Sequence, residues 1–509
     1  MISSLEKALW LIKNPWRLTR FLVRDCNLLG CPPLGVGLVY FQELDPLFRE
    51  EDSQAHVLEL EPQVFWTIKK SNDGQSELRG NVARLAQIRS APQRKLIHSV
   101  GAPVGGMGRP NDDHFRLLAE WAHALDAHWV SDHLSFNSVR CGDEIKHTGF
   151  FLPPRQTAGG VRLAARNIGH LRNAVQKPVA FETGVNYLQP RSDEMSDGAF
   201  FAAVAEEADC GIVLDLHNLW ANERNGRARV CDVVDALPLE RVWEIHLAGG
   251  KLLDGYYLDA HSGLIPEPVL ELAADVVSRT PNLGAIIFEI LPNFVADIGL
   301  ARIRRQLSAM NDVWRLRPMR TAMIPRLPTQ QKEGRPQADA EDLKRWELAL
   351  SAAALNHGTR LREDEPACDV LHDPGLEIYR KLIADFRDSQ ITRIMRHTIT
   401  LLLAHLGATR VRELLSSYRN ETFPDAYPSI EADQFARFLF DRLDSLGETP
   451  YLADVLGFEH AVVRAALYGQ SSHIEWKVDP AQLFDSLSAG RMPAPAPISP
   501  TIMEIRGET

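Results

Sequence analysis

The sequence predicts an α/β fold, a (β/α)8 TIM barrel followed by a smaller, mostly α-helical C-terminal domain. Two observations lead to this prediction. Between residues 34 and 326, short β-rich apolar runs alternate with longer segments of helical periodicity, which is the pattern of a barrel of parallel strands. Beyond a polar, proline-containing stretch, helical periodicity dominates.

The apolar runs have the length of barrel strands, and most of them end in polar residues. We expect strands at Leu34–Val39, Val57–Glu61, Lys95–His98, His128–Asp132, Pro178–Glu182, Gly211–Asp215, Val242–His246 and Ala285–Glu289. Segments with apolar residues three or four positions apart lie between them. We expect these segments to form helices at Asp112–Ala127, Ala158–Val175, Ser196–Ala208 and Pro266–Ser278.

The composition divides the chain into five regions. We expect a helical extension at 1–33, the barrel at 34–326, a linker at 327–342, a mostly helical domain at 343–490 and a proline-rich extended tail at 491–509. Within the helical domain, the periodicity predicts helices at Glu377–Phe386, Ile391–Leu406 and Gln434–Leu446.

Charge and composition exclude several classes of protein. The chain has 509 residues with 45% hydrophobic residues and a formal net charge of −11, which is typical of a folded globular protein and not of a disordered one. An acidic balance disfavours nucleic-acid binding through phosphate contacts. The apolar patch at Ala8–Ile12 is interrupted by Lys13 and is too short to span a bilayer, so we expect no membrane partner.

The cysteines indicate the compartment and exclude some cofactors. None of the six forms a CxxC pair, which disfavours a thiolate zinc site or a redox dithiol and fits a reducing, cytoplasmic location. The glycine-rich segment 101–106 lacks the strand–helix context of a dinucleotide-binding loop. We therefore expect no organic cofactor.

Side chains that bind metal ions follow most of the predicted strands. The carboxyl ends of barrel strands converge on one face, where active sites form. Those ends carry His98, Ser131-Asp132-His133, Glu182, Asp215-Leu216-His217-Asn218, His246, Asp259-Ala260-His261 and Glu289. A single one of these residues fits a structural role equally well, but several carboxylates buried together are costly unless cations neutralise them. The set as a whole predicts a metal centre.

The types of ligand narrow the choice of metal. No cysteine falls at a strand end, and a mixture of His, Asp, Glu and Asn suits iron or manganese, with zinc left open. The candidates exceed what one ion needs, so the sequence predicts two or three ions. Asp132 and Glu182 are the candidate shared carboxylates.

At these positions the sequence resembles the multinuclear non-heme iron-dependent oxidative enzymes, the family of the methanobactin maturase. The resemblance covers about residues 34–326, and the matching segments occur in the family's order. They are His98-Ser99-Val100-Gly101, Ser131-Asp132-His133-Leu134-Ser135, Phe181-Glu182, Val185-Asn186-Tyr187-Leu188, Leu214-Asp215-Leu216-His217-Asn218, Ile245-His246-Leu247-Ala248-Gly249, Asp259-Ala260-His261 and Phe288-Glu289.

The resemblance implies a set of metal ligands by matching position. They are His98, Asp132, Glu182, Asn218, His246, Asp259, His261 and Glu289. Asp132, His133 and Asp215 are the candidate catalytic residues, the last two either as ligands or as groups that orient ligands. The sequence departs from the family at Glu61, which stands where the family has a histidine and is an additional candidate ligand. Further departures are Thr183 and Ile290-Leu291.

The family resemblance also implies a reaction. Two or three irons, in mixed Fe2+ and Fe3+ states, would use O2 as co-substrate to modify a ribosomally synthesised precursor peptide oxidatively, at cysteine. The ferric ion would bind the substrate thiolate, and the ferrous ion would activate O2.

The C-terminal domain has a resemblance of its own. Pro450-Tyr451-Leu452-Ala453-Asp454-Val455 and Phe458-Glu459-His460-Ala461 look like a motif of the small partner proteins that accompany these enzymes. Such partners bind the precursor peptide and present it to the barrel. This resemblance implies that residues 343–490 bind the peptide, while a generic helical domain stays open as the alternative.

Two other functions stay open from the sequence. A hydrolase or isomerase on a similar barrel would hold two or three zinc or manganese ions with comparable ligands. A non-catalytic peptide-binding or metal-storage protein would need the same residues without turnover. Iron-loaded protein that is coloured and responds to a thiol peptide and O2 would favour the oxidative enzyme, whereas colourless zinc-loaded protein would favour the hydrolase or isomerase.

Overall fold

The fold is described from a computed structural model of the chain. It describes residues 31–70, 76–142, 144–318, 336–356, 369–447, 449–491 and 493–507, with the backbone alone at 336–339. The expected extension at 1–33 and the expected linker at 327–342 therefore lie mostly outside the described residues.

The chain folds into two compact units, each built from separate stretches of sequence. The first contains the described residues up to Phe65, together with Asn81–Phe136 and Pro153–Glu347. The second contains Trp66–Gly80, Asn137–Leu152 and the described residues from Leu348 onward. The C-terminal helices thus share a unit with two segments that leave and re-enter the barrel's stretch of chain.

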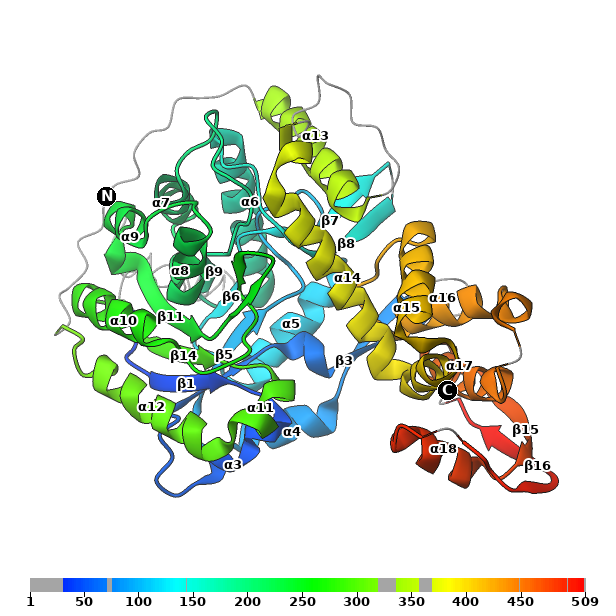
Figure 1. The fold of residues 1–509 in the computed structure, drawn as a ribbon. Coiled ribbons are helices and arrows are strands. Elements are labelled where there is room, and N and C mark those ends of the chain that lie inside the picture. Colours follow the sequence, from blue (N-terminus) through cyan, green and yellow to red (C-terminus); the bar gives the residue numbers. More distant parts are fainter. Residues whose placement is uncertain are drawn as a thin grey trace, which may run out of the picture. The chain divides into compact units, whose positions relative to one another are not determined.

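The first unit is a closed barrel of parallel strands, which confirms the predicted TIM barrel (Figure 1). Around the barrel the order is β1-β14-β11-β10-β9-β6-β5-β2. The strands are β1 (Gly35–Val39), β2 (Val57–Leu60), β5 (Arg94–Ser99), β6 (Val130–His133), β9 (Val179–Glu182), β10 (Gly211–Asp215), β11 (Val242–Ala248) and β14 (Ala285–Glu289). Each overlaps a predicted strand, because buried parallel strands produce apolar runs that are visible in the sequence.

Helices surround the barrel and follow its strands. They are α3 (Asp45–Arg49), α4 (Val82–Ser90), α5 (Asp112–Ala124), α6 (Ala158–Val175), α7 (Asp197–Ala208), α8 (Leu216–Arg224), α9 (Val230–Ala236), α10 (Glu267–Arg279), α11 (Pro292–Ile298) and α12 (Leu300–Trp314), with short 3-10 turns η1 (Gln42–Leu44), η2 (Pro62–Phe65) and η3 (Leu239–Arg241). Asn111 and Thr157 start α5 and α6 as N-caps, since each side chain accepts a backbone N–H of the first turn. A small hairpin, β12 (Lys251–Leu253) and β13 (Tyr256–Leu258), follows β11.

The second unit is mostly helical, as expected, and its described residues also contain three two-stranded sheets. Its helices are η4 (Asp369–His372), α14 (Pro374–Ile394), α15 (Arg396–Glu421), α16 (Pro428–Phe440), η5 (Leu443–Leu446), α17 (Leu452–Tyr468) and α18 (Pro480–Ser488). The sheets pair β3 (Trp66–Lys70) with β4 (Ser76–Gly80), β7 (Phe136–Cys141) with β8 (Glu144–Leu152), and β15 (Ser472–Val478) with β16 (Pro497–Ile505). Within this unit α14 packs on β8, and α17 packs on β3.

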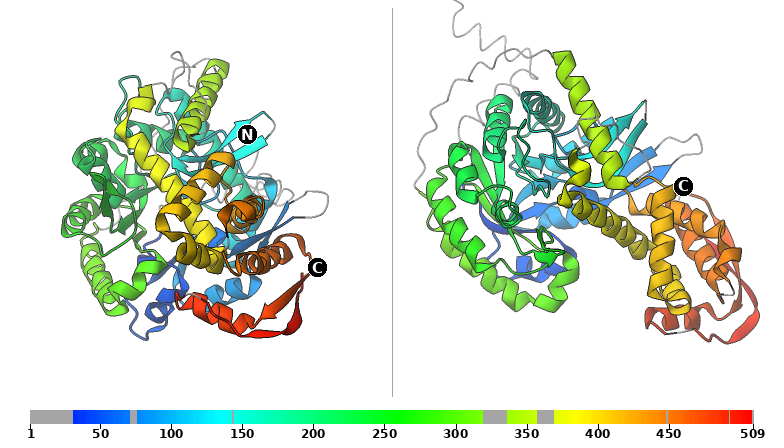
Figure 2. Two further views of the ribbon diagram at one scale, coloured as in Figure 1. Left: turned by 45° about the vertical axis from the view of Figure 1, so that its right-hand side comes forward. Right: turned by 45° about the horizontal axis from the view of Figure 1, so that its top comes forward.

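Two details differ from the sequence-based expectations. The tail expected at 491–509 is not a lone extended segment, because β16 pairs antiparallel with β15 beside α18 (Figure 2). The helix expected at Ile391–Leu406 is divided at Met395, whose φ of −109° and ψ of 43° end α14 before α15 begins. None of the described helices combines the length and apolar character that crossing a membrane requires.

Helix α13 (Pro336–Leu355) begins in the first unit, where Trp346 anchors it. The indole is 1% exposed, its N–H faces the Pro153 carbonyl at 3.4 Å, and the guanidinium groups of Arg155 and Arg191 lie 5.0 and 4.9 Å from its ring centre. The next residue, Glu347, accepts the backbone N–H of Met107 at 2.9 Å. The middle of α13 is therefore bound to the loops that follow β5, β8 and β9.

Candidate metal centre

Histidine and carboxylate side chains meet at the carboxyl ends of the barrel strands. His98 is the next-to-last residue of β5, Glu182 ends β9, Asp215 ends β10 and Glu289 ends β14, and each is at most 3% exposed. They are brought together because parallel strands in a closed barrel present their carboxyl ends on one face. All four side chains therefore lie at the face where the sequence predicts a metal centre.

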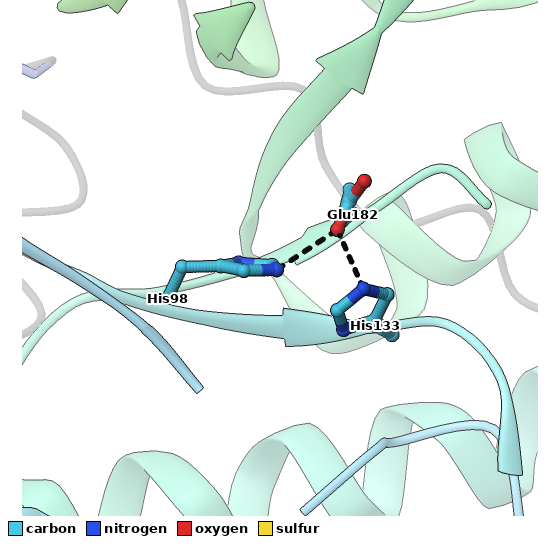
Figure 3. Close-up of side chains that lie close together, drawn as sticks. All are labelled: His98, His133 and Glu182. Atoms are coloured by element: carbon cyan, nitrogen blue, oxygen red, sulfur yellow. Dashed lines mark ion pairs between the residues drawn. The ribbon is translucent and has the colours of Figure 1, made fainter. Parts of the chain in front are cut away.

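Glu182 lies between the imidazoles of His98 and His133 (Figure 3). Its Oε2 atom is 3.0 Å from Nε2 of His98 and 3.2 Å from Nε2 of His133. Nδ1 of His98 is 2.9 Å from the Ser131 hydroxyl, which leaves Nε2 directed at the carboxylate. The three side chains offer ligand atoms close enough together to hold one metal ion.

The same carboxylate takes part in a second group, with Asp215, His246 and Glu289. Nδ1 of His246 lies 3.4 Å from Oε1 of Glu289 and 3.9 Å from Oε1 of Glu182. The two oxygens of Glu182 thus face two different groups of ligands. This is the arrangement expected of a shared carboxylate, and it places Glu182 at the middle of the centre.

Asp215 connects the centre to the backbone of α8. Its Oδ1 atom accepts the backbone N–H of Asn218 at 2.7 Å and caps the helix, while Oδ2 has no hydrogen-bond partner among the described residues. The Asn218 side chain donates to Oε1 of Glu182 at 3.4 Å. Strand β10 therefore passes directly into α8 with both residues fixed beside Glu182.

A third cluster surrounds Asp259, in the segment after β13. Its Oδ1 atom lies 2.8 Å from Nε2 of His261 and 3.2 Å from Nδ1 of His217. Nε2 of His261 also lies 3.4 Å from Oε2 of Glu289, which joins this cluster to the second group. His261 has a φ of 44°, a left-handed conformation that is uncommon for a residue other than glycine and that clusters at functional sites.

Asp132 and Glu61, like Asp259 and His261, lie outside the groups of described side chains that could hold a metal ion. Both oxygens of Asp132 accept backbone N–H groups, from Ala102 at 3.0 Å and from His133 at 2.8 Å, and Asp132 belongs to none of the metal-binding groups found among the described residues. Glu61 follows the end of β2 and also lies outside those groups. Their roles as ligands stay predictions.

Sequence analysis missed two buried carboxylates, Glu59 and Glu244. With His246 they form another group that could hold a metal ion. Both are fully buried inside the barrel, on β2 and β11. A signal is present in the sequence, because a glutamate in the interior of an apolar strand is unusual, but an argument from strand ends does not include it.

Burial and neighbouring charges shift the pKa values of several side chains in the centre. Burial alone would lower the pKa of His98, but the charges of Glu182 and Glu59 raise it to about 10. Burial, together with the charge of Glu244, raises the pKa of Glu59 to about 8. Burial and the nearby charges of Asp259 and Glu182 raise the pKa of Asp215 well above its usual value.

The residues fit a metal centre. Buried polar atoms without a hydrogen-bond partner among the described residues include Oε2 of Glu182, Oδ2 of Asp215, both ring nitrogens of His246 and Oε2 of Glu289. Such a concentration of unsatisfied donors and acceptors is costly in a closed core. Cations that bind carboxylate and imidazole would relieve that cost.

The fold and the site together define the class of protein: a TIM barrel whose strand ends carry clusters of histidine and carboxylate able to hold more than one metal ion. Residues 48–294 match the family described as "RiPP precursor modification enzyme MbnB/TglH/ChrH". The chain belongs to this family, which confirms the resemblance to the multinuclear non-heme iron-dependent oxidative enzymes.

Similar proteins carry the name UPF0276. One from Anaeromyxobacter sp. (strain Fw109-5) is 30% identical over 234 residues, which are 46% of this chain and 81% of that protein. One from Acaryochloris marina is 29% identical over 46% of this chain and 82% of that protein. One from Streptomyces avermitilis is 29% identical over 40% of this chain, which spans only 42% of the length of that protein.

Solved structures show a more distant likeness. D-psicose 3-epimerase from Clostridium cellulolyticum H10 is 10% identical, with a TM-score of 0.36 over 56% of this chain and 99% of that chain. The IOLI protein with a bound zinc atom is 11% identical, with a TM-score of 0.34 over 55% of this chain and 97% of that chain. A likeness of this size carries no argument about function.

Proposed function

We propose that the protein is an iron- and O2-dependent enzyme that oxidatively modifies a ribosomally synthesised precursor peptide at cysteine. Two or three irons in mixed Fe2+ and Fe3+ states would occupy the centre. The observation that supports this most directly is the position of Glu182, whose two oxygens face two groups of histidine and carboxylate ligands. Membership of a family described as modifying RiPP precursors supports a peptide substrate.

The chain's own residues would hold the metals and orient one another. Bound iron would supply redox chemistry and Lewis acidity. His98, His133 and Glu182 would hold one ion, while Asp215, His246 and Glu289 with the other oxygen of Glu182 would hold a second. Ser131 fixes the ring of His98 through Nδ1, and the cap on α8 fixes Asp215.

Exposure indicates how the substrate would reach the centre. The side chains of His133, Asp259 and His261 are 19%, 18% and 23% exposed, whereas Glu182 is 3% exposed and His246 is fully buried. We therefore propose that the peptide side chain approaches from the side of His133 and His261. The buried carboxylates on the opposite side would keep water away from the reacting group.

Two further parts of the proposal concern the rest of the chain. The region at 343–490 would bind the precursor peptide, as the resemblance of its Pro450–Val455 segment to partner proteins suggests. A cytoplasmic location is consistent with Cys210, a buried cysteine that forms no disulfide.

The deciding experiment is coexpression with a short peptide encoded beside this gene, followed by mass analysis of the peptide. We expect a change in mass that maps to cysteine and is absent without O2, and we expect the purified protein to contain iron. A His246→Ala variant is the control for the chemistry. An unmodified peptide together with colourless, zinc-loaded protein would contradict the proposal and favour a hydrolase or isomerase.

A further inference from the structure

The imidazole of His246 lies between two sets of carboxylates. On one side, Nδ1 faces Glu289 at 3.4 Å and Glu182 at 3.9 Å. On the other side, Nε2 faces Oε2 of Glu59 at 3.2 Å and Oε1 of Glu244 at 3.7 Å. A neutral imidazole has one N–H and one lone pair, so only one of its two nitrogens can bind a metal ion.

The two sides differ in the ligands that they offer. The Nδ1 side has three carboxylates, from Glu182, Asp215 and Glu289, and one of them is shared with the group around His98. On the Nε2 side, Oε2 of Glu244 already accepts the indole N–H of Trp129 at 2.8 Å. Only Glu59 there has both oxygens without a hydrogen-bond partner among the described residues.

The surroundings of Glu59 suit a hydrogen-bond acceptor better than a metal ligand. It lies on β2 within the barrel and is fully buried. Its Oε2 atom lies 3.2 Å from Nε2 of His246, within the reach of an N–H···O bond, and among the described residues neither atom has another hydrogen-bond partner. Histidines that bind metals commonly donate their other ring N–H to a carboxylate, which fixes the tautomer and makes the ligating nitrogen a better donor.

We propose that Glu59 is a positioning residue that accepts the Nε2–H of His246 and thereby presents Nδ1 to a metal ion held with Glu182, Asp215 and Glu289. Glu244, which accepts the indole N–H of Trp129, is the second carboxylate on the Nε2 side of His246. The inference rests on the metal centre of the proposed function but not on the oxidative reaction. Its alternative is a cation on the Nε2 side, with Glu59 as a direct ligand.

Cobalt(II) is the probe that distinguishes these arrangements. We would titrate it anaerobically into the purified full-length protein and record the number of bound ions, the affinity and the visible absorption bands. Glu59→Gln keeps an oxygen that accepts the N–H, whereas Glu59→Leu keeps neither oxygen. Glu289→Gln, which removes a proposed ligand, is the matched control.

We expect the number of bound ions to be unchanged in both Glu59 variants. Affinity should fall on the order of 10–100-fold in Glu59→Leu and should be largely rescued in Glu59→Gln. Glu289→Gln should lose one ion. If Glu59→Leu does not fold, a Glu59→Gln variant that keeps every ion and shows shifted absorption bands still supports the inference.

Two results would overturn the inference while leaving the metal centre intact. One is a Glu59→Leu variant that binds cobalt as tightly as the wild type, with identical absorption bands. The other is the loss of one ion in Glu59→Gln, which would make Glu59 a ligand. A wild-type protein that binds no cobalt or iron would instead overturn the metal centre itself, and the inference with it.

Discussion

The Oε2 atom of Glu182 lies 3.0 Å from Nε2 of His98, while Oε1 of the same side chain points toward His246. We predict that Glu182→Gln loses more than one equivalent of iron, because a shared carboxylate supports both groups. His133→Ala should lose one equivalent, since His133 belongs to a single group. Elemental analysis after anaerobic reconstitution with ferrous iron measures both. Equal losses in the two variants would show that Glu182 is not shared.

His246→Ala should bind less iron and lose turnover by at least about 100-fold, the effect expected when a metal ligand is removed. His170→Ala is the matched control, because His170 is an exposed histidine on α6. Iron content and peptide modification should be measured on the same preparations. Unchanged iron content in His246→Ala would mean that the metal lies elsewhere.

The variant Asp215→Asn separates the role of Asp215 as the N-cap of α8 from its proposed role as a metal ligand. Asparagine is as good an N-cap as aspartate, so the stability of α8 should not change. The loss of the negative charge beside Glu182 should weaken metal binding by about tenfold or more. Circular dichroism melting of the apoprotein and metal titration test these two expectations separately. An unchanged melting temperature together with unchanged metal affinity would assign Asp215 to capping alone.

Trp346→Ala should loosen the attachment of α13 to the barrel loops. Replacing a buried tryptophan by alanine costs about 3–5 kcal/mol, and here it also removes the ring that the guanidinium groups of Arg155 and Arg191 contact. Hydrogen exchange should accelerate at the amide of Met107, which donates to the neighbouring Glu347. Trp346→Phe, which keeps an aromatic ring, should show a smaller effect. Wild-type exchange rates in both variants would contradict this anchoring role.

Glu347 should make stability depend on pH. Burial raises its pKa from 4.5 to about 8, although the N–H of Met107 opposes the shift. A folded-state pKa above the unfolded one means that stability is fully present below about pH 4.5 and is lost as the pH rises through about 8.

The Glu347→Gln variant should therefore gain stability over the wild type between pH 6 and 9, with little difference at pH 4.5. Glu341→Gln, an exposed position on the same helix, is the control and should match the wild type throughout. Melting temperatures across this pH range provide the measurement. Parallel curves for Glu347→Gln and the wild type would contradict the buried, neutral state of Glu347.

The barrel could be predicted from the sequence because its strands are buried on both faces and therefore appear as apolar runs. The gathering of His98, Glu182 and Glu289 followed from their positions at strand ends. Glu59 was missed because it lies in the middle of a strand and faces the barrel interior. Strands β3 (Trp66–Lys70) and β8 (Glu144–Leu152) were not predicted, because the helices that they pack against, α17 and α14, are distant in the sequence.

The second unit contains the segments Trp66–Gly80 and Asn137–Leu152 as well as the C-terminal helices, so three separate stretches of the gene encode it. A recombination event that replaced only the C-terminal helices would pair β3 and β8 with new helices in place of α17 and α14, and their packing surfaces would not be complementary. Exchanging this unit for another would therefore require three coordinated replacements. We therefore expect the two units to be inherited together as one gene.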